Sequence, residues 1–356
     1  MYQKNPFNLS FGRKPNEYID RYTDEAHIFN TFTELPVTDQ IYVLMGVRGA
    51  GKTVAMTDIS DRIKELKDWI VIKITPIDDI LDALFKILIN NKRVHQMCLE
   101  AKLDISVLGV SVSVSNKTSG QNLVHSIDEI LEQLQENNIK VLIAIDEVTD
   151  TPQMRSFISA FQLFITNNRP IFFLATALFE EIESLRNVRN LTFLYRAPKA
   201  ILSQLNIGAI ANTYERVFAC TRTQALKMAS MTKGYPLAFQ ILGYVTWEHQ
   251  KSGILSNEII SEFDQRIAET AYSKLWSELS ENDKRVMIAI AKTTTSSVKC
   301  IREAADMDPN KFNQYRRRLK ERGLIDVQQY GTISFSLPRF KEFLQTEEFD
   351  FFIDDV

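Results

Sequence analysis

Short apolar runs alternate with amphipathic stretches between residues 40 and 196 of this chain. Each run is rich in β-branched residues and is apolar at nearly every position, which is typical of strands buried on both faces of a parallel sheet. The predicted strands span residues 41–45, 69–74, 141–145, 171–175 and 192–195. The stretches between them predict helices over residues 54–66, 77–99, 124–137 and 154–166. This βαβ alternation predicts an α/β domain with a five-stranded parallel sheet.

Two segments depart from this alternation, one within it and one after it. Residues 103–114 are apolar at every second position around Gly109, which predicts a small inserted hairpin. This hairpin is either an edge ribbon that covers a helix or a ribbon that binds a partner. From residue 198 to about residue 275 the pattern is purely helical, with Ser203, Thr221 and Ser256 as predicted N-caps.

Residues 279–344 are predicted to form a compact small domain. Helices are predicted after the cap Ser280, over residues 298–305 and from residue 309 or 310 to 322, and strands over residues 324–328 and 332–336. Gly323 is the expected C-cap of the third helix, and Tyr330 and Gly331 form the turn between the strands. Three helices followed by a two-stranded ribbon predict a winged helix-turn-helix.

The segment from Gly46 to Thr53 lies directly between a predicted strand and a predicted helix. Its sequence, Gly-Val-Arg-Gly-Ala-Gly-Lys-Thr, matches the phosphate-binding pattern G-x-x-x-x-G-K-[ST] in the context that the pattern requires. Backbone N–H groups of such a loop face the phosphates. Lys52 is expected to contact the β- and γ-phosphates, and the Thr53 hydroxyl to hold Mg²⁺. The predicted nucleotide-binding residues are Gly46, Arg48, Gly49, Ala50, Gly51, Lys52, Thr53 and Val54.

Two more predicted strands end in polar residues. Asp146 follows strand 141–145, where an aspartate that holds Mg²⁺ is expected, and Glu147 is expected to polarise the attacking water as a general base if it lies within hydrogen-bond reach of it. Thr176 follows strand 171–175 and is expected to sense the γ-phosphate or orient water beside Glu147, unless it is an ordinary strand-end residue. Lys52, Asp146, Glu147 and Thr176 are therefore the predicted catalytic residues, and Thr53 and Asp146 the predicted magnesium ligands.

These three segments resemble the Walker A, Walker B and sensor-1 elements of AAA+-type ATPases. Gly234-Tyr235-Pro236 resembles the Gly-x-Pro motif of the STAND branch, which implies that Pro236 packs near the adenine and couples a helical lid to nucleotide state. An alternative is a simple helix start with Tyr235 in the core. A C-terminal winged helix is shared by STAND ATPases and by initiator-type, origin-recognition-like AAA+ ATPases. The resemblance covers nearly the whole chain.

Other arginine positions bear on this resemblance. Residues 11–13 (Phe-Gly-Arg) or 19–21 (Ile-Asp-Arg) resemble the family's Gly-Arg segment that approaches the base. Pro236 is followed by Leu-Ala-Phe-Gln, so the lid arginine expected of initiator-type members is absent, which favours the STAND branch. An arginine that acts on a neighbouring subunit's γ-phosphate would imply a homo-oligomer, and the candidates are Arg186, Arg189 and Arg196.

Charge is distributed unevenly along the chain. The whole sequence has a net charge of −3, but residues 283–342 carry 13 Lys and Arg against 7 Asp and Glu, a local charge of +6. Phe312, Tyr315 and Leu319 form the predicted inward face of the third helix of the small domain. This leaves an outward face suited to contacting double-stranded DNA, made of Lys311, Asn313, Gln314, Arg317 and Lys320. The local charge favours contact with DNA over internal or protein contact.

Composition places the chain among globular proteins, with 45% apolar and 24% charged residues. The start of the chain has no apolar segment typical of a secretory signal, and no uncharged stretch, residues 234–247 included, is long enough to span a bilayer. Three widely spaced cysteines predict neither a disulfide framework nor a zinc site. A cytoplasmic protein without membrane contacts is therefore expected.

The predicted organisation is a P-loop nucleotide-binding α/β domain (1–197), a helical lid (198–278), a winged helix (279–345) and an acidic tail (346–356). The functional hypothesis is an ATPase that acts as a nucleotide-driven switch with ATP and Mg²⁺, and whose winged helix binds DNA. The resemblance implies slow turnover. The alternative is a signalling switch ATPase whose winged helix makes internal or protein contacts and does not bind DNA.

Overall fold

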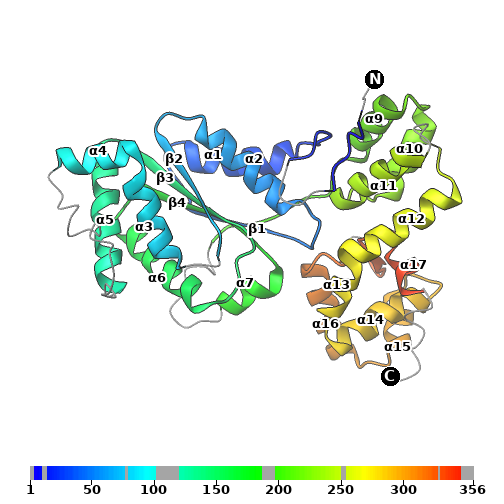
Figure 1. The fold of residues 1–356 in the computed structure, drawn as a ribbon. Coiled ribbons are helices and arrows are strands. Elements are labelled where there is room, and N and C mark those ends of the chain that lie inside the picture. Colours follow the sequence, from blue (N-terminus) through cyan, green and yellow to red (C-terminus); the bar gives the residue numbers. More distant parts are fainter. Residues whose placement is uncertain are drawn as a thin grey trace. The chain divides into compact units, whose positions relative to one another are not determined.

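A computed structural model describes residues 4–9, 14–76, 79–101, 120–186, 197–249, 254–327 and 329–345 of the chain. The chain divides into two compact units. The sheet unit comprises residues 22–45 and 52–201, and the helical unit comprises residues 1–21, 46–51 and 202–356 (Figure 1). The loop that matches the phosphate-binding pattern (residues 46–51, called the phosphate-binding loop below) thus packs with the helical unit, while the helix that follows it belongs to the sheet unit.

A five-stranded sheet with strand order β2-β3-β4-β1-β5 forms the centre of the sheet unit, and all its pairs are parallel, as predicted. Its strands are β1 (Ile41–Met45), β2 (Trp69–Ile74), β3 (Lys140–Ile145), β4 (Ile171–Ala177) and β5 (Lys199–Ile201). Alternate residues of β1 face opposite ways: Val43 lies in a core with α3, α5 and α6, whereas Tyr42 packs against Phe32 of α1. Burial on both faces explains why β1, β3 and β4 are apolar at nearly every position.

The helices of the sheet unit are α1 (Tyr22–Thr33), α2 (Lys52–Lys64), α3 (Ile80–Asn90), α4 (Lys92–Glu100), α5 (Gly120–Glu136), α6 (Pro152–Thr166) and α7 (Phe179–Arg186). The prediction of a single helix over residues 77–99 is wrong. Asn91 adopts an extended backbone conformation, and its side chain accepts hydrogen bonds from the N–H groups of Arg93 and Val94. This cap ends α3 and starts α4.

The fifth strand differs from the predicted one. β5 pairs with β1 and lies at the start of the segment that was predicted to be purely helical, so that prediction is wrong over residues 199–201. Three residues are too few to show a periodicity. The predicted strand 192–195 and the predicted hairpin 103–114 both lie outside the described residues.

A single hydrophobic core runs through the helical unit from Phe7 to Leu344. Its first part contains α9 (Ile207–Phe218), α10 (Arg222–Met231), α11 (Pro236–His249), α12 (Asn257–Ile267), the π-helical turn η2 (Ala268–Tyr272) and α13 (Ser273–Ser277). Thr221 and Ser256 cap α10 and α12 as predicted. Ser203 is not a cap, because Asn206 caps α9 and the Ser203 carbonyl instead accepts a hydrogen bond from Arg21. No helix among the described residues has both the length and the apolar character of a bilayer span.

The second part of the helical unit contains three helices and a short antiparallel ribbon, in the predicted order. These elements are α14 (Glu281–Lys292), α15 (Val298–Ala304), α16 (Pro309–Glu321), β6 (Ile325–Asp326) and β7 (Ser334–Phe335), followed by α17 (Phe340–Leu344). Ser280 caps α14 and Gly323 follows α16 with a φ of +74°, both as expected. A bridge between Ser297 and Thr332 joins the ribbon to the start of α15. This is the element order of a winged helix-turn-helix.

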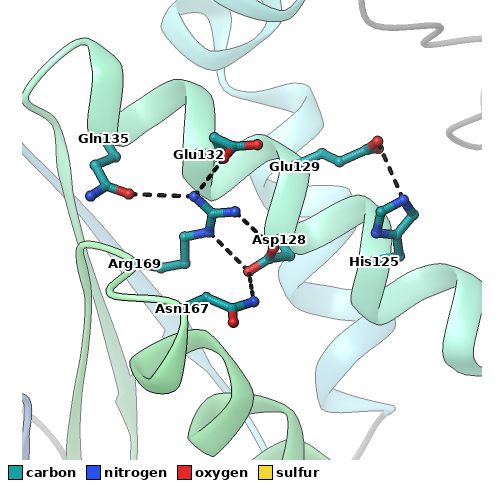
Figure 2. Close-up of polar contacts among 7 residues, drawn as sticks. All are labelled: His125, Asp128, Glu129, Glu132, Gln135, Asn167 and Arg169. Carbon is teal, nitrogen blue, oxygen red and sulfur yellow. Dashed lines mark hydrogen bonds and ion pairs between the residues drawn. The ribbon is translucent and has the colours of Figure 1, made fainter.

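An ion-pair cluster fastens α5 to the start of β4. Arg169 donates hydrogen bonds to both carboxylate oxygens of Asp128, at 3.0 and 2.9 Å, and to Glu132 at 3.0 Å, while Asn167 also donates to Asp128 (Figure 2). Burial alone would raise the pKa of Asp128, but the hydrogen bonds from Arg169 and Asn167 and the charge of Arg169 outweigh it and lower the pKa. The cluster lies at the opposite end of β4 from Thr176, so its role is to stabilise the fold.

Replacing Asp128 by asparagine is expected to lower the free energy of unfolding by about 2 kcal/mol near pH 7, because it leaves the half-buried Arg169 without its main partner. The folded-state pKa of Asp128 is lowered, so the ionised pair stabilises the protein above the ordinary carboxylate pKa of about 4, and this contribution is lost as pH falls through the folded-state value. Urea unfolding at pH 7 and pH 3.5 measures both effects. The neighbouring Glu129→Gln, which removes only the more exposed His125–Glu129 pair, is the control and should change stability by less than about 0.5 kcal/mol. Equal losses of unfolding free energy in Asp128→Asn and Glu129→Gln would contradict a stabilising role for the Asp128–Arg169 pair.

Candidate functional site

The sheet unit brings together a hydroxyl and a carboxylate at the end of β3. Thr53, in the first turn of α2, donates a hydrogen bond to Asp146, whose carboxylate oxygens lie 2.8 and 3.1 Å from the Thr53 Oγ1. These residues are 93 positions apart in the sequence. The predicted magnesium ligands are therefore in contact. Lys52 is the first residue of the same helix, and Val54 follows in it.

Thr176 fixes the turn that carries Asp146 and Glu147. It is fully buried in β4, its hydroxyl donates to Asp146 Oδ1, and the same hydroxyl accepts a hydrogen bond of 2.9 Å from the Glu147 N–H. Its carbonyl also accepts from the Val148 N–H at 2.8 Å. Glu147 has a φ of 52°, in the left-handed region, and its side chain is exposed. Because the hydroxyl hydrogen of Thr176 is engaged by Asp146, this residue positions the Asp146–Glu147 turn here.

The phosphate-binding loop has the backbone conformation that its glycines permit. Gly49 and Gly51 have φ values of +74° and +82°, which residues with a Cβ rarely adopt. A Cβ on Gly49 would also overlap the Tyr235 hydroxyl and lie 2.8 Å from the Leu237 Cβ. The loop is thus a glycine-dependent turn placed directly before Lys52.

The start of α11 contacts this loop within the helical unit. The Tyr235 hydroxyl donates a hydrogen bond to the Arg48 carbonyl, and the Leu237 N–H donates to the Gly49 carbonyl at 3.3 Å. Pro236, the first residue of α11, has carbon atoms 3.7 Å from the place of a Cβ on Gly51. Burial raises the pKa of Tyr235, so its hydroxyl stays protonated and able to donate. Two interpretations of Gly234-Tyr235-Pro236 follow from the sequence, a helix start with a core tyrosine and a lid that contacts the loop. These contacts agree with both.

Arg21 also contacts the loop. Its side chain is 6% exposed, and its Nη2 and Nε atoms donate hydrogen bonds of 2.7 Å to the carbonyls of Ala50 and Ser203. Of the two segments that resemble the family's Gly-Arg pattern, residues 11–13 lie outside the described part of the chain, and Arg21 is the one found at the loop. It ties the phosphate-binding loop to the chain that leads into α9.

Helix α16 presents the predicted polar face. Phe312 and Leu319 are buried and Tyr315 packs against the same core. The predicted outward residues, Lys311, Asn313, Gln314, Arg317 and Lys320, are all exposed. Two basic residues nearby are engaged elsewhere. Arg318 donates to the buried carboxylate of Asp283 and to the Ser280 hydroxyl, and Arg339 pairs with Asp264 and Glu342.

No cluster of three or more His, Cys, Asp or Glu side chains among the described residues could hold a metal ion. The arginine candidates for a neighbouring subunit's γ-phosphate stay predictions. Arg186 is the last residue of α7, and Arg189 and Arg196 lie outside the described residues. The hydrogen bond between the Tyr235 hydroxyl and the Arg48 carbonyl joins residues 187 positions apart, and its sequence signal is the resemblance of residues 234–236 to the Gly-x-Pro motif.

Comparison with known proteins gives one family match and several structural ones. Residues 269–344 match a family model described as a domain of unknown function (DUF8462). A sequence comparison with curated proteins finds no match. The structure is similar to the Aeropyrum pernix ORC2 protein in its ADP form, at 13% identity and a TM-score of 0.49, over 94% of this chain and 95% of that one.

Two further structures are similar to this chain. Cdc6p from Pyrobaculum aerophilum matches at 13% identity and a TM-score of 0.47, over 95% of each chain. Domain III of the Thermotoga maritima replication initiation protein DnaA matches at 13% identity and a TM-score of 0.41, over 73% of this chain and 98% of that one.

Proposed function

We propose that this protein is a nucleotide-driven switch that binds ATP with Mg²⁺, hydrolyses it slowly and binds duplex DNA through α16. The observation that carries the nucleotide part is the contact between the Thr53 hydroxyl and the Asp146 carboxylate. Both groups are hard oxygen donors of the kind that Mg²⁺ prefers. A hydroxyl after the loop lysine and an aspartate at the end of a second strand are the two magnesium ligands of P-loop ATPases. The residues present therefore fit the metal.

Each residue of the candidate site has a role in this proposal. Backbone N–H groups of residues 46–52 bind the phosphates, and Lys52 places its ammonium group on the β- and γ-phosphates. Bound Mg²⁺ neutralises negative charge on the phosphates. Glu147 accepts a proton from the attacking water. Thr176 holds the turn that carries Asp146 and Glu147. Pro236 packs near the adenine of the nucleotide.

The exposed face of α16 carries the DNA part of the proposal. Lys311, Arg317 and Lys320 supply positive charge for phosphate contacts, and Asn313 and Gln314 supply the amide groups that pair with base edges in a major groove. A third helix with these side chains on its outer face is the geometry of a helix-turn-helix reader. Arg318 and Arg339 are left out of the proposed interface because Asp283 and Asp264 hold them. The exposed Arg317, by contrast, pairs among the described residues only with Glu321 of the same helix, at 3.3 Å.

Duplex DNA is expected to bind with an affinity that falls steeply with salt, and Arg317→Ala with Lys320→Ala is expected to weaken it. If each side chain neutralises one phosphate, the slope of log K against log salt becomes shallower by about 2 in this double variant. The measurement is fluorescence anisotropy of labelled duplex across a salt series, in ATP, in ADP and without nucleotide. The matched control, Lys292→Ala with Lys299→Ala, removes the same charge from exposed positions of α14 and α15.

The control separates specific contact from net charge. Equal losses in both double variants would show that α16 is not the interface. No binding by the wild type even at low salt would favour the alternative, a signalling switch whose winged helix makes internal or protein contacts. In that case the nucleotide part of the proposal still stands, and nucleotide-dependent partner capture or homo-oligomer formation becomes the property to measure.

A further inference from the structure

Arg48 is held at both of its ends. Its carbonyl accepts the hydrogen bond from the Tyr235 hydroxyl, and its guanidinium Nη2 donates to Glu278 Oε1 at 2.9 Å. Glu278 is the C-cap of α13, two residues before Ser280, the cap of α14. One residue of the phosphate-binding loop therefore contacts both the start of α11 and the junction that leads into the C-terminal helices.

The residue before Arg48 makes a second contact with the same helices. Val47 Cγ1 lies 3.7 Å from the place that a Cβ on Gly323 would occupy. Gly323 directly follows the C-cap of α16, the helix that carries the proposed DNA-binding face. Arg48 therefore contacts a residue just before α14 in the sequence, and Val47 lies close to the residue that follows the C-cap of α16.

The contact between Arg48 and Glu278 can be made and broken easily. It is a single hydrogen bond and not the bidentate pairing that makes arginine–carboxylate contacts strong, and the two side chains are 35% and 29% exposed. Arg48 Nε is buried and has no hydrogen-bond partner among the described residues. An unsatisfied buried donor costs free energy, so the guanidinium is not held in its best hydrogen-bonded arrangement here.

We propose that Arg48 and Glu278 couple nucleotide binding to the C-terminal helices, an inference that rests on the proposed nucleotide site. Phosphates bind the N–H groups of the loop, and each N–H shares a rigid peptide plane with the carbonyl of the residue before it. The carbonyls of Arg48 and Gly49 are those bonded by Tyr235 and Leu237. Ordering these planes fixes Arg48, and with it the contact to Glu278. Since coupling is reciprocal, breaking this contact must alter ATP affinity.

A double-mutant cycle on the full-length chain tests the coupling. Arg48→Ala and Glu278→Ala are each expected to change the dissociation constant of ATP with Mg²⁺ by about fivefold, and the double variant by the same factor and not by the product. Hydrogen exchange supplies a second readout. ATP should protect residues 274–281 in the wild type, and that protection should be lost in all three variants. Lys274→Ala is the matched control, because Lys274 contacts the same Glu278 carboxylate at 3.6 Å without touching the loop.

The outcomes separate this proposal from the proposed function. If the wild type binds ATP but all variants keep its affinity and its protection pattern, the coupling is wrong and the nucleotide site stands. Multiplicative effects in the double variant would also overturn it. If the wild type does not bind ATP, the proposed function fails, and the coupling fails with it. The Arg48–Glu278 contact is tested separately without nucleotide, since Arg48→Ala should then speed exchange over residues 274–281 and Lys274→Ala should not.

Discussion

Replacing Lys52 by alanine is expected to raise the dissociation constant for ATP by roughly 100-fold or more. Lys52 opens α2 directly after the phosphate-binding loop, where its ammonium group is the proposed contact of the β- and γ-phosphates. Truncating one partner of a close, desolvated charge pair costs about 3 kcal/mol, and each 1.4 kcal/mol is about a tenfold loss of affinity. Titration of a fluorescent ATP analogue in the presence of Mg²⁺ measures the change.

A second lysine on the same helix provides the control for this experiment. Lys64 is the last residue of α2 and is exposed, so Lys64→Ala removes the same charge and leaves the loop unchanged. It should bind ATP like the wild type. Thermal unfolding of both variants shows whether each is folded. A folded Lys52→Ala protein with wild-type affinity for ATP would falsify the proposed nucleotide site.

Much of the sheet could be predicted from the sequence because burial leaves a local signal. The strands at residues 41–45 and 69–74 match β1 and β2, since a strand covered on both faces is apolar at nearly every position. The contact between Thr53 and Asp146 could be expected for the same reason: each residue follows an element whose position in a parallel sheet is fixed by its pattern. Local patterns therefore predicted the part of the site that Thr53 and Asp146 form.

Other features depend on contacts that leave no local pattern. A single side-chain cap at Asn91 divides a continuous helical periodicity into α3 and α4. Glu278 reaches the loop from 230 positions along the chain, and nothing around it in the sequence indicates this contact. Arg318 stands beside Arg317 on a basic helix, yet it is bound by the buried Asp283. A count of charges along a sequence does not show which arginine is held by a buried carboxylate and which is exposed.

Replacing Glu147 by glutamine is expected to slow ATP hydrolysis by roughly 100- to 1,000-fold while ATP still binds. Loss of a general base removes a factor of this order, and glutamine keeps the size of the side chain. The backbone around Glu147 is held independently of its carboxylate, by the hydrogen bond from its N–H to Thr176. The substitution should therefore leave the left-handed turn and Asp146 in place. Single-turnover hydrolysis measured with excess enzyme isolates the chemical step from product release.

Comparison with a second acid shows whether the effect belongs to this position. Glu180 is exposed in the first turn of α7, shortly after β4, and Glu180→Gln removes the same charge. It should hydrolyse ATP at the wild-type rate. If Glu147→Gln hydrolyses like the wild type, Glu147 is not the base. If it instead loses ATP binding, its carboxylate acts in binding and the general-base role is equally wrong. Only a variant that holds ATP and fails to cleave it supports a carboxylate that acts on the attacking water.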